Sequence, residues 1–260
     1  MGIYPQQRQQ ALMELDKPLF CIAHRGGSQR YENTLRAISR ALELGVDAIE
    51  IDVWNVRGEL LVFHDRRLSS GPFNGELLVQ QDPEELRKTP LSCGEHIPTL
   101  LEVMELVADK ALLNIELKGP GCVKSVSQQI EDFVLYKQGS YESYLISSFD
   151  HVQLHKLSQR LPEVKRGALF AGVPLDYAAC CEQLGAYSLH ACLGFLRQGL
   201  IDDASARGLK TWVYTVNHEE DMGHLAAMGV DGVFTDFPEK VLALNTEYLL
   251  RHPKVESGSF

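Results

Sequence analysis

The chain has 260 residues, 45% of them hydrophobic and 23% charged, with a formal net charge of −10 at pH 7. This length suits one α/β domain with a sizeable core, so we expect residues 1–260 to form a single domain. The negative charge argues against binding to nucleic acid, and no apolar run approaches the roughly 18 residues that a membrane helix requires.

The N-terminus and the cysteines indicate the cellular setting. Residues 1–18 lack a basic start followed by an apolar stretch, and Gln6 stands where a myristoylation signal has Ser or Thr. The six cysteines show no CxxC pairing, which predicts free thiols and argues against both a disulfide framework and a zinc site. We therefore expect a cytoplasmic protein, as a monomer or a homo-oligomer.

The first expected strand is the apolar run at 18–23, which ends in His24 and Arg25. A helical pattern follows from Leu35, and Asn33 is the expected N-cap because its side chain can accept from the first free backbone N–H groups. Gly45 is expected to end this helix.

Residues 47–65 place acidic residues inside a strand pattern. Side chains alternate in a strand, so Ile49 and Ile51 share one face while Glu50 and Asp52 share the other. Only residues 55–58 separate this run from a second one at 59–64, a gap too short for a parallel crossover, which predicts an antiparallel hairpin. The hairpin would bring His64 beside the two acids. An ordinary strand with acids facing water is the alternative reading.

Further along, residues 66–98 are rich in Gly, Pro and polar residues, and we expect an excursion from the core there. A helical pattern follows at 98–107. Residues 111–119 repeat the earlier anomaly, because Glu116 and Lys118 share one strand face opposite apolar side chains.

The rest of the chain alternates between strand and helix patterns. Strands are expected at 144–149, 165–170, 186–190, 210–216 and 230–235, and helices at 150–161, 175–184, 198–206 and 219–228. If the run at 59–64 is only a return arm, eight strands remain, which predicts a TIM (β/α)8 barrel with a small insertion after the second strand. A doubly wound open sheet is the alternative. In a barrel, the acids near strand C-termini would meet at the mouth.

Converging acids require compensation. At about 4 Å and an effective dielectric constant near 20, each like-charged pair costs roughly 4 kcal/mol. Carboxylate ligands without cysteine favour Mg²⁺ or Ca²⁺, with proton sharing or pairing to Lys118 as the alternative. Two histidines, His24 and His64, can supply a general acid and a general base. Arg25 and Lys118 provide the positive charge that holds a phosphate, although each could be an ordinary ion pair.

A series of ordered motifs closely resembles the glycerophosphodiester phosphodiesterase family. The match covers about residues 20 to 242. Its motifs read HRGG at 24–27, ENT at 32–34, EIDV at 50–53, HD at 64–65, ELK at 116–118, SSF at 147–149, WVYTVN at 212–217 and GVDGVFTDFP at 229–238. The resemblance implies a TIM barrel that cleaves small glycerophosphodiesters to glycerol 3-phosphate and an alcohol with a divalent cation.

Carried over to this sequence, the resemblance implies roles for individual residues. Glu50, Asp52 and Glu116 would bind the metal, and His24 and His64 would be the acid and base. Phosphate contacts are expected from Arg25 and Lys118, and a substrate-pocket lining from Phe149 and Trp212. Residues 66–98 would match an insertion over the barrel mouth. The alternatives are a phospholipase-type enzyme acting on lysophospholipid or phosphoinositide, and a non-catalytic binder of phosphorylated metabolites.

Overall fold

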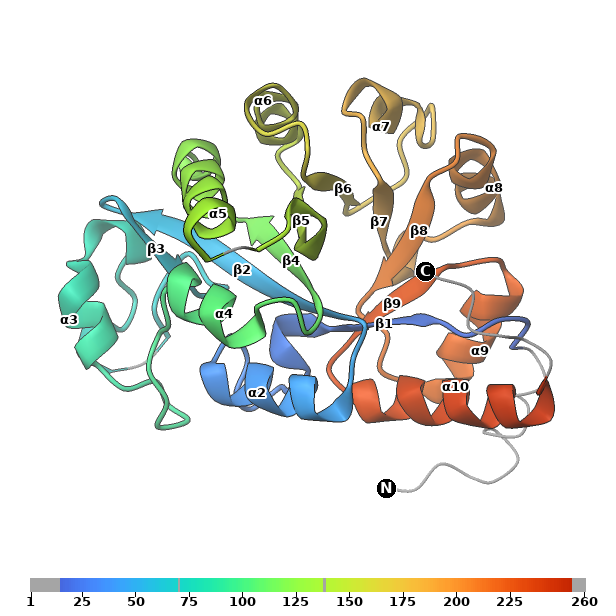
Figure 1. The fold of residues 1–260 in the computed structure, drawn as a ribbon, viewed down its shortest axis with the longest axis horizontal. Helices are drawn as coiled ribbons and strands as arrows, with labels where there is room; N and C mark the ends of the chain where they lie inside the picture. The colour runs from blue at the N-terminus through green and yellow to red at the C-terminus, as the bar shows by residue number, and fades with distance from the viewer. Residues whose placement is uncertain (1–14, 70, 138, 254–260) are drawn as a thin grey trace.

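A computed structural model of the protein describes residues 15–69, 71–137 and 139–253. The interpretation of residues 1–18 as lacking a secretory or myristoylation signal falls mainly on residues 1–14, which lie outside the described residues. In the described part, eight parallel strands close into a barrel, which confirms the predicted TIM-barrel fold (Figure 1). Around the barrel they are β1 (Phe20–Ala23), β2 (Ala48–Val56), β4 (Leu112–Leu117), β5 (Tyr144–Ser148), β6 (Lys165–Phe170), β7 (Ser188–Cys192), β8 (Lys210–Tyr214) and β9 (Gly232–Thr235). Pairing of β1 with both β9 and β2 closes the ring.

Helices cover the outside of the barrel (Figure 1). Their bounds are α2 (Leu35–Leu44), α4 (Leu100–Val107), α5 (Cys122–Lys137), α6 (His151–Arg160), α7 (Ala179–Gln183), α8 (Gln198–Ala206), α9 (Glu219–Ala227) and α10 (Pro238–Arg251). The outward faces of the strands and the inward faces of these helices share one hydrophobic cluster, which includes Ile49, Ile51 and Ile115. The strand faces that carry the acids therefore point into the barrel.

The predicted hairpin is present. The strand β3 (Glu59–Val62) pairs antiparallel with β2, with Val53 opposite Val62. Arg57 and Gly58 form the turn, and both have positive φ, of 52° and 101°. Two successive positive φ values are typical of the tight turns that match the twist of antiparallel strands.

The segment after the hairpin has a small core of its own. It contains three short elements, η2 (Gly71–Phe73), η3 (Leu78–Gln80) and α3 (Pro83–Lys88), beside the β2–β3 hairpin at the left of Figure 1. Its apolar side chains pack on one face of the hairpin in a separate cluster of Trp54, Val56, Leu61, Leu68, Leu78, Leu86 and Ile97. Residues 66–98 are thus an insertion anchored on the hairpin.

One helix start differs from the expectation. The N-cap of α2 is Thr34, whose Oγ1 accepts a hydrogen bond from the backbone N–H of Ala37. Asn33, the expected cap, lies one residue earlier with φ of 58°, and its side chain points to β2 instead. Both residues can cap a helix, so composition alone did not fix the register. The C-terminal end at Gly45 is as predicted.

Candidate active site

Three carboxylates meet inside the barrel. Glu50 and Asp52 project from β2, and Glu116 projects from the neighbouring β4, where it lies in register with Asp52. They are only 3%, 1% and 9% exposed, and each offers an oxygen within 4.8 Å of the others. The alternation that was read from the sequence therefore brings the three acids to one point.

Burial and mutual repulsion make this cluster costly. Burial, followed by the charges of Asp52 and Glu116, raises the pKa of Glu50 well above its usual value. The pKa of Glu116 is also raised, again first by burial and then by Asp52. Both shifts show that the fold holds these carboxyl groups where negative charge is unfavourable unless a positive charge joins them.

Two cationic side chains supply part of that charge. Lys118 Nζ lies 2.7 Å from Glu116 Oε1 and 3.4 Å from Asp52 Oδ1. Arg25 Nε lies 3.3 Å from Asp52 Oδ2. Burial alone would lower the pKa of Lys118, but the adjacent carboxylates outweigh it and raise the pKa. Two cations nevertheless face three acids, so the cluster keeps an acidic excess.

Three hydrogen bonds from the loop after β1 hold Asp52 and Glu50 in place. Asn33 Nδ2 donates to Asp52 Oδ2 at 2.8 Å, and Asn33 Oδ1 accepts from the backbone N–H of Asp52 at 3.2 Å. The backbone N–H of Arg25 donates to Glu50 Oε2 at 2.9 Å. The loop after β1 therefore holds the acids of β2 from one side.

His24 is oriented by a carboxylate that the sequence analysis did not select. Its Nδ1 lies 2.7 Å from Asp236 Oδ1. Asn217 and Gln29 donate to the other oxygen of Asp236, and although burial opposes ionisation, the bonds from His24 and from these amides lower its pKa. An ionised carboxylate can only accept, so Nδ1 carries the hydrogen and Nε2 is left for a substrate.

His64 has a matching partner in the adjacent residue. Its Nδ1 lies 2.7 Å from Asp65 Oδ1, so the same argument leaves Nε2 for a substrate. Asp65 was visible in the HD motif, and Asp236 directly follows a buried strand. The signal that selected the other acids, a carboxyl group at a strand end, would also have found Asp236.

A cavity of about 280 Å³ joins these groups. Its wall carries both histidines, Arg25 and Lys118 together with Glu50, Glu116, Asn114, Ser147, Phe149, Leu169, Tyr214, Thr215 and Phe234. The side-chain polar atoms of Asn114 and Ser147 are buried and make no hydrogen bond within the protein. Buried polar groups normally have partners, so these two are suited to receive a polar ligand.

The two aromatic residues expected in the pocket are in different places. Phe149 lines the cavity and is 45% exposed. Trp212 does not line it: the ring is 2% exposed and stacks between Phe20 and His190, at ring-centroid distances of 5.2 and 5.1 Å. Trp212 occupies the middle of β8, too early in the strand to reach the mouth, and Tyr214 at the end of β8 takes that position. Trp212 is therefore a core residue of the barrel interior.

The three acids fit a hard divalent cation. They present only carboxylate oxygens, which Mg²⁺ and Ca²⁺ prefer over nitrogen or sulfur ligands. Bound cation would also compensate the excess negative charge that raises the pKa of Glu50. The residues present thus match the chemistry of the metal class that the sequence indicated.

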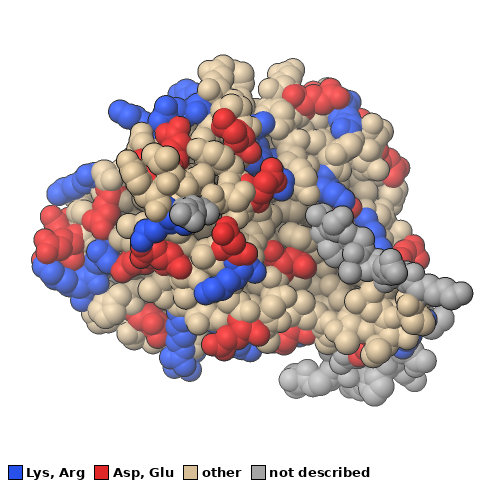
Figure 2. Space-filling view, in the orientation of Figure 1, with Lys and Arg blue, Asp and Glu red and all other residues tan. Residues whose placement is uncertain are grey.

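Charged side chains of both signs share the surface of the molecule. On the face shown in Figure 2, Lys and Arg side chains are interspersed with Asp and Glu, and the basic residues do not gather into one area. Among the described residues, no helix is both long and apolar enough to cross a bilayer.

Comparisons with known proteins agree on one family. The model of the glycerophosphoryl diester phosphodiesterase family matches residues 24–240. A glycerophosphodiester phosphodiesterase of Caldanaerobacter subterraneus subsp. tengcongensis is 36% identical over 86% of this chain and 96% of its own. The structure of an Oleispira antarctica phosphodiesterase in complex with the product sn-glycerol-3-phosphate has a TM-score of 0.77 at 30% identity, covering 90% of this chain and 98% of its own. Human lysophospholipase D GDPD1 is a more distant relative, 24% identical over 85% of this chain and 84% of its own.

Proposed function

The chain belongs to the glycerophosphoryl diester phosphodiesterase family, and we propose that it hydrolyses small glycerophosphodiesters to sn-glycerol 3-phosphate and an alcohol. The observation that carries the proposal is the joining of three acids and two histidine–aspartate pairs around one cavity. The product named for the Oleispira antarctica structure supports the same substrate class.

Binding of the phosphodiester follows from the charges in the cavity. Arg25 and Lys118 would contact the phosphate oxygens, since both line the cavity beside the acids. Glu50, Asp52 and Glu116 would hold Mg²⁺ or Ca²⁺, which when bound would neutralise charge on the phosphoryl oxygens.

The two histidines would move the protons. One takes the proton of the glycerol 2-hydroxyl, whose oxygen attacks the phosphorus of the same molecule, a step that proximity favours. The P–O bond to the alcohol breaks, and the other histidine gives that alcohol oxygen a proton. Water then opens the cyclic phosphate with the histidine roles reversed. Asp236 and Asp65 keep both rings in the required tautomer.

The domain organisation, cellular location and oligomeric state are predictions from the sequence. Residues 1–260 are expected to act as one domain in the cytoplasm, with residues 66–98 as an insertion over the barrel mouth. A monomer and a homo-oligomer are both compatible with a site built from the residues of one chain.

The deciding experiment measures glycerol 3-phosphate release from glycerophosphocholine with Mg²⁺ or Ca²⁺. We expect turnover that a chelator stops and an added divalent cation restores. His24→Ala and His64→Ala are each expected to lose activity while circular dichroism stays unchanged. Binding of the diester without turnover in saturating cation would favour a non-catalytic binder, and full activity after exhaustive chelation would refute the metal site.

Hydrolysis of lysophospholipid is the second candidate. The exposed ring of Phe149 at the cavity could contact an acyl chain, and the human relative is named a lysophospholipase D. Comparing lysophosphatidylcholine with glycerophosphocholine separates the two activities. We expect the glycerophosphodiester to be the better substrate.

A further inference from the structure

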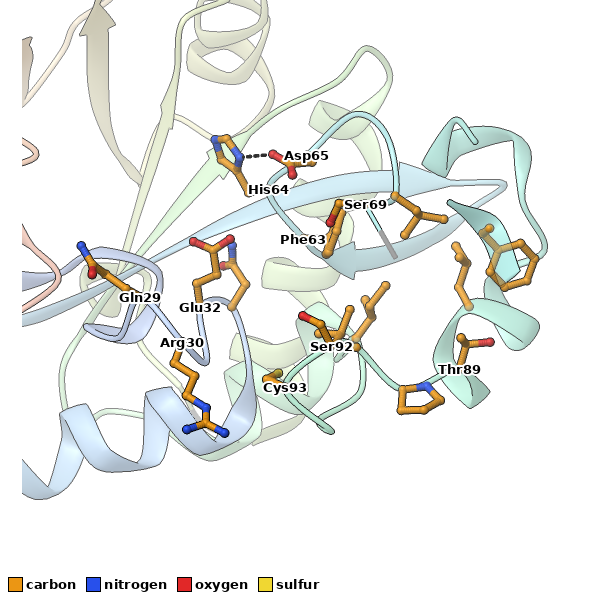
Figure 3. A pocket seen from close by; sticks show the side chains of 17 residues that line it. Gln29, Arg30, Glu32, Phe63, His64, Asp65, Ser69, Thr89, Ser92 and Cys93 are labelled. Atoms are coloured by element: carbon orange, nitrogen blue, oxygen red, sulfur yellow. Dashed lines mark hydrogen bonds and ion pairs between the residues drawn. The ribbon is translucent and has the colours of Figure 1, made fainter. Parts of the chain in front are cut away.

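A second cavity lies between the insertion and the barrel (Figure 3). Three segments form it: the loop after β1 with Glu32, the end of the hairpin with Phe63 and His64, and the insertion with Leu68, Phe73 and Cys93. None of the groups that hold phosphate or metal in the proposed site faces this cavity.

His64 connects the second cavity to the catalytic cavity, because it lines both. In Figure 3 its ring and the bonded Asp65 stand at one edge of the group of lining residues. His64 thus lies at the boundary of the two cavities, so a molecule whose phosphorus lies beside His64 in the catalytic cavity would have one of its two ester arms on the side of the second cavity.

The two sides of the second cavity differ in polarity. The insertion contributes an apolar wall in which Leu68, Leu86 and Ile97 belong to its own core, with Phe63 and Phe73 packed against them. The loop after β1 contributes charged side chains, and they are already engaged: Glu32 pairs with Arg25 at 2.8 Å, and the Arg30 guanidinium lies over the ring of Tyr31. An alcohol with methyl or methylene groups would bury them against the insertion.

Size sets a limit on the occupant. The cavity measures about 150 Å³, and cavities of about this size in protein cores accept a molecule as large as benzene. The arm that enters would thus have roughly six or seven non-hydrogen atoms, the size of choline or a similar amino alcohol. A long acyl chain would extend out of this space.

We propose that the second cavity is the binding site for the leaving alcohol of the phosphodiester, and that it selects a small alcohol with an apolar or ammonium end. This inference rests on the proposed function, because it assigns the two ester arms to opposite sides of His64. The glycerol arm would stay in the catalytic cavity, where the unpartnered Asn114 and Ser147 are available to its hydroxyl groups. Aromatic rings such as Phe63 and Phe73 suit the methyl groups of an ammonium end.

Cys93 allows the proposal to be tested on the folded protein. It is a free, partly exposed thiol on the wall of this cavity. Benzyl methanethiosulfonate converts the thiol into a mixed disulfide with release of methanesulfinate, and dithiothreitol reverses the change. Two substrates are compared before and after labelling: glycerophosphocholine and the methyl ester of glycerol 3-phosphate, whose leaving methanol is too short to fill the cavity.

Labelling of Cys93 is expected to impair one substrate and to spare the other. Labelling should lower kcat/KM for glycerophosphocholine by about tenfold or more and change that for the methyl ester less than about twofold. Dithiothreitol should restore activity, and a Cys93→Ser variant treated in the same way should be unaffected. Glycerophosphocholine, but not the methyl ester, should also slow the labelling of Cys93.

Three results would overturn the inference: an equal effect on both substrates, no effect after mass spectrometry shows modified Cys93, or a thiol that does not react. A failure of the proposed function looks different, because the unlabelled protein would hydrolyse neither substrate. The protection of Cys93 by glycerophosphocholine still tests the cavity in that case.

Discussion

Glu50→Gln should stabilise the protein in the absence of metal while removing its response to metal. The substitution keeps the shape of the side chain, and the Gln carbonyl can still accept from the backbone N–H of Arg25. What it removes is one of three negative charges that share a buried site.

The magnitude follows from two estimates. Carboxylate oxygens within 4.8 Å of one another repel by about 3 kcal/mol per pair at an effective dielectric constant near 20. Glu50 can escape this repulsion by binding a proton, and at pH 7 that costs about 3 kcal/mol for a carboxyl group whose ordinary pKa is 4.5. The gain from Glu50→Gln at pH 7 is therefore bounded at about 3 kcal/mol, or roughly 5–10 °C in Tm for a domain near this size.

The pH dependence has a definite sign. The pKa of Glu50 is raised in the folded state, so between 4.5 and that raised value the folded protein binds more protons than the unfolded chain. Wild-type stability from this group falls as pH rises through that window. The advantage of Glu50→Gln should accordingly shrink between pH 7 and pH 5.

The assay is thermal unfolding in chelator and in excess Mg²⁺ or Ca²⁺, with Glu163→Gln as a control that removes an exposed carboxylate. We expect Tm of Glu50→Gln to exceed wild type in chelator, and the metal-induced increase in Tm to be present in wild type and the control only. A lower Tm in chelator together with a full metal response would refute the reasoning.

Three further changes test other parts of the structure. The proposed alcohol site places the leaving oxygen on the side of His64, so we expect His64 to be the general acid and His24 the general base. A diester with p-nitrophenol as the leaving group needs no protonation of that group, so it should rescue His64→Ala far more than His24→Ala, each of which is expected to lose about 10²-fold or more on the choline diester. Equal rescue of the two variants would contradict this assignment. Asn33→Gly keeps the positive φ of this position but removes both hydrogen bonds to Asp52. It should raise the cation concentration for half-maximal activity by about tenfold. An unchanged cation concentration would show that Asn33 does not hold Asp52 in place. Burial lowers the pKa of His190 to about 3. As the pH falls from 6.5 toward 3, this histidine is therefore protonated in the unfolded chain but not in the folded protein, and the free energy of unfolding falls by up to about 5 kcal/mol. His190→Gln should reduce that loss in denaturant titrations at pH 7 and pH 4, and an identical loss in both proteins would exclude His190 as its source.

The sequence alone predicted the site residues whose position depends on the alternation of side chains along a strand. Glu50, Asp52 and Glu116 broke the apolar pattern of their strands, and the barrel brings them together. Eight barrel strands were obtained only by leaving out the predicted return arm at 59–64, and the antiparallel pairing of β3 confirms that choice.

The sequence was insufficient where position along a strand or contact between distant segments decides the role. Trp212 and Tyr214 are both aromatic residues of β8 on the same face, and only the register of the barrel shows that Tyr214 reaches the mouth. His24 and Asp236 are separated by 212 positions, and nothing local to either residue indicates their contact. The second cavity likewise depends on how the insertion packs, which composition does not encode.

The β2–β3 hairpin is a wall with a different core on each side, since Val53, Leu60 and Val62 belong to the barrel cluster while Trp54, Val56 and Leu61 belong to the insertion cluster. Because the two sets alternate along the same strands, residues 66–98 can change during evolution without disturbing the packing of the barrel. The chemistry of bond cleavage and the choice of alcohol can then diverge separately between relatives, which makes this segment the natural unit to exchange when a new specificity is to be engineered.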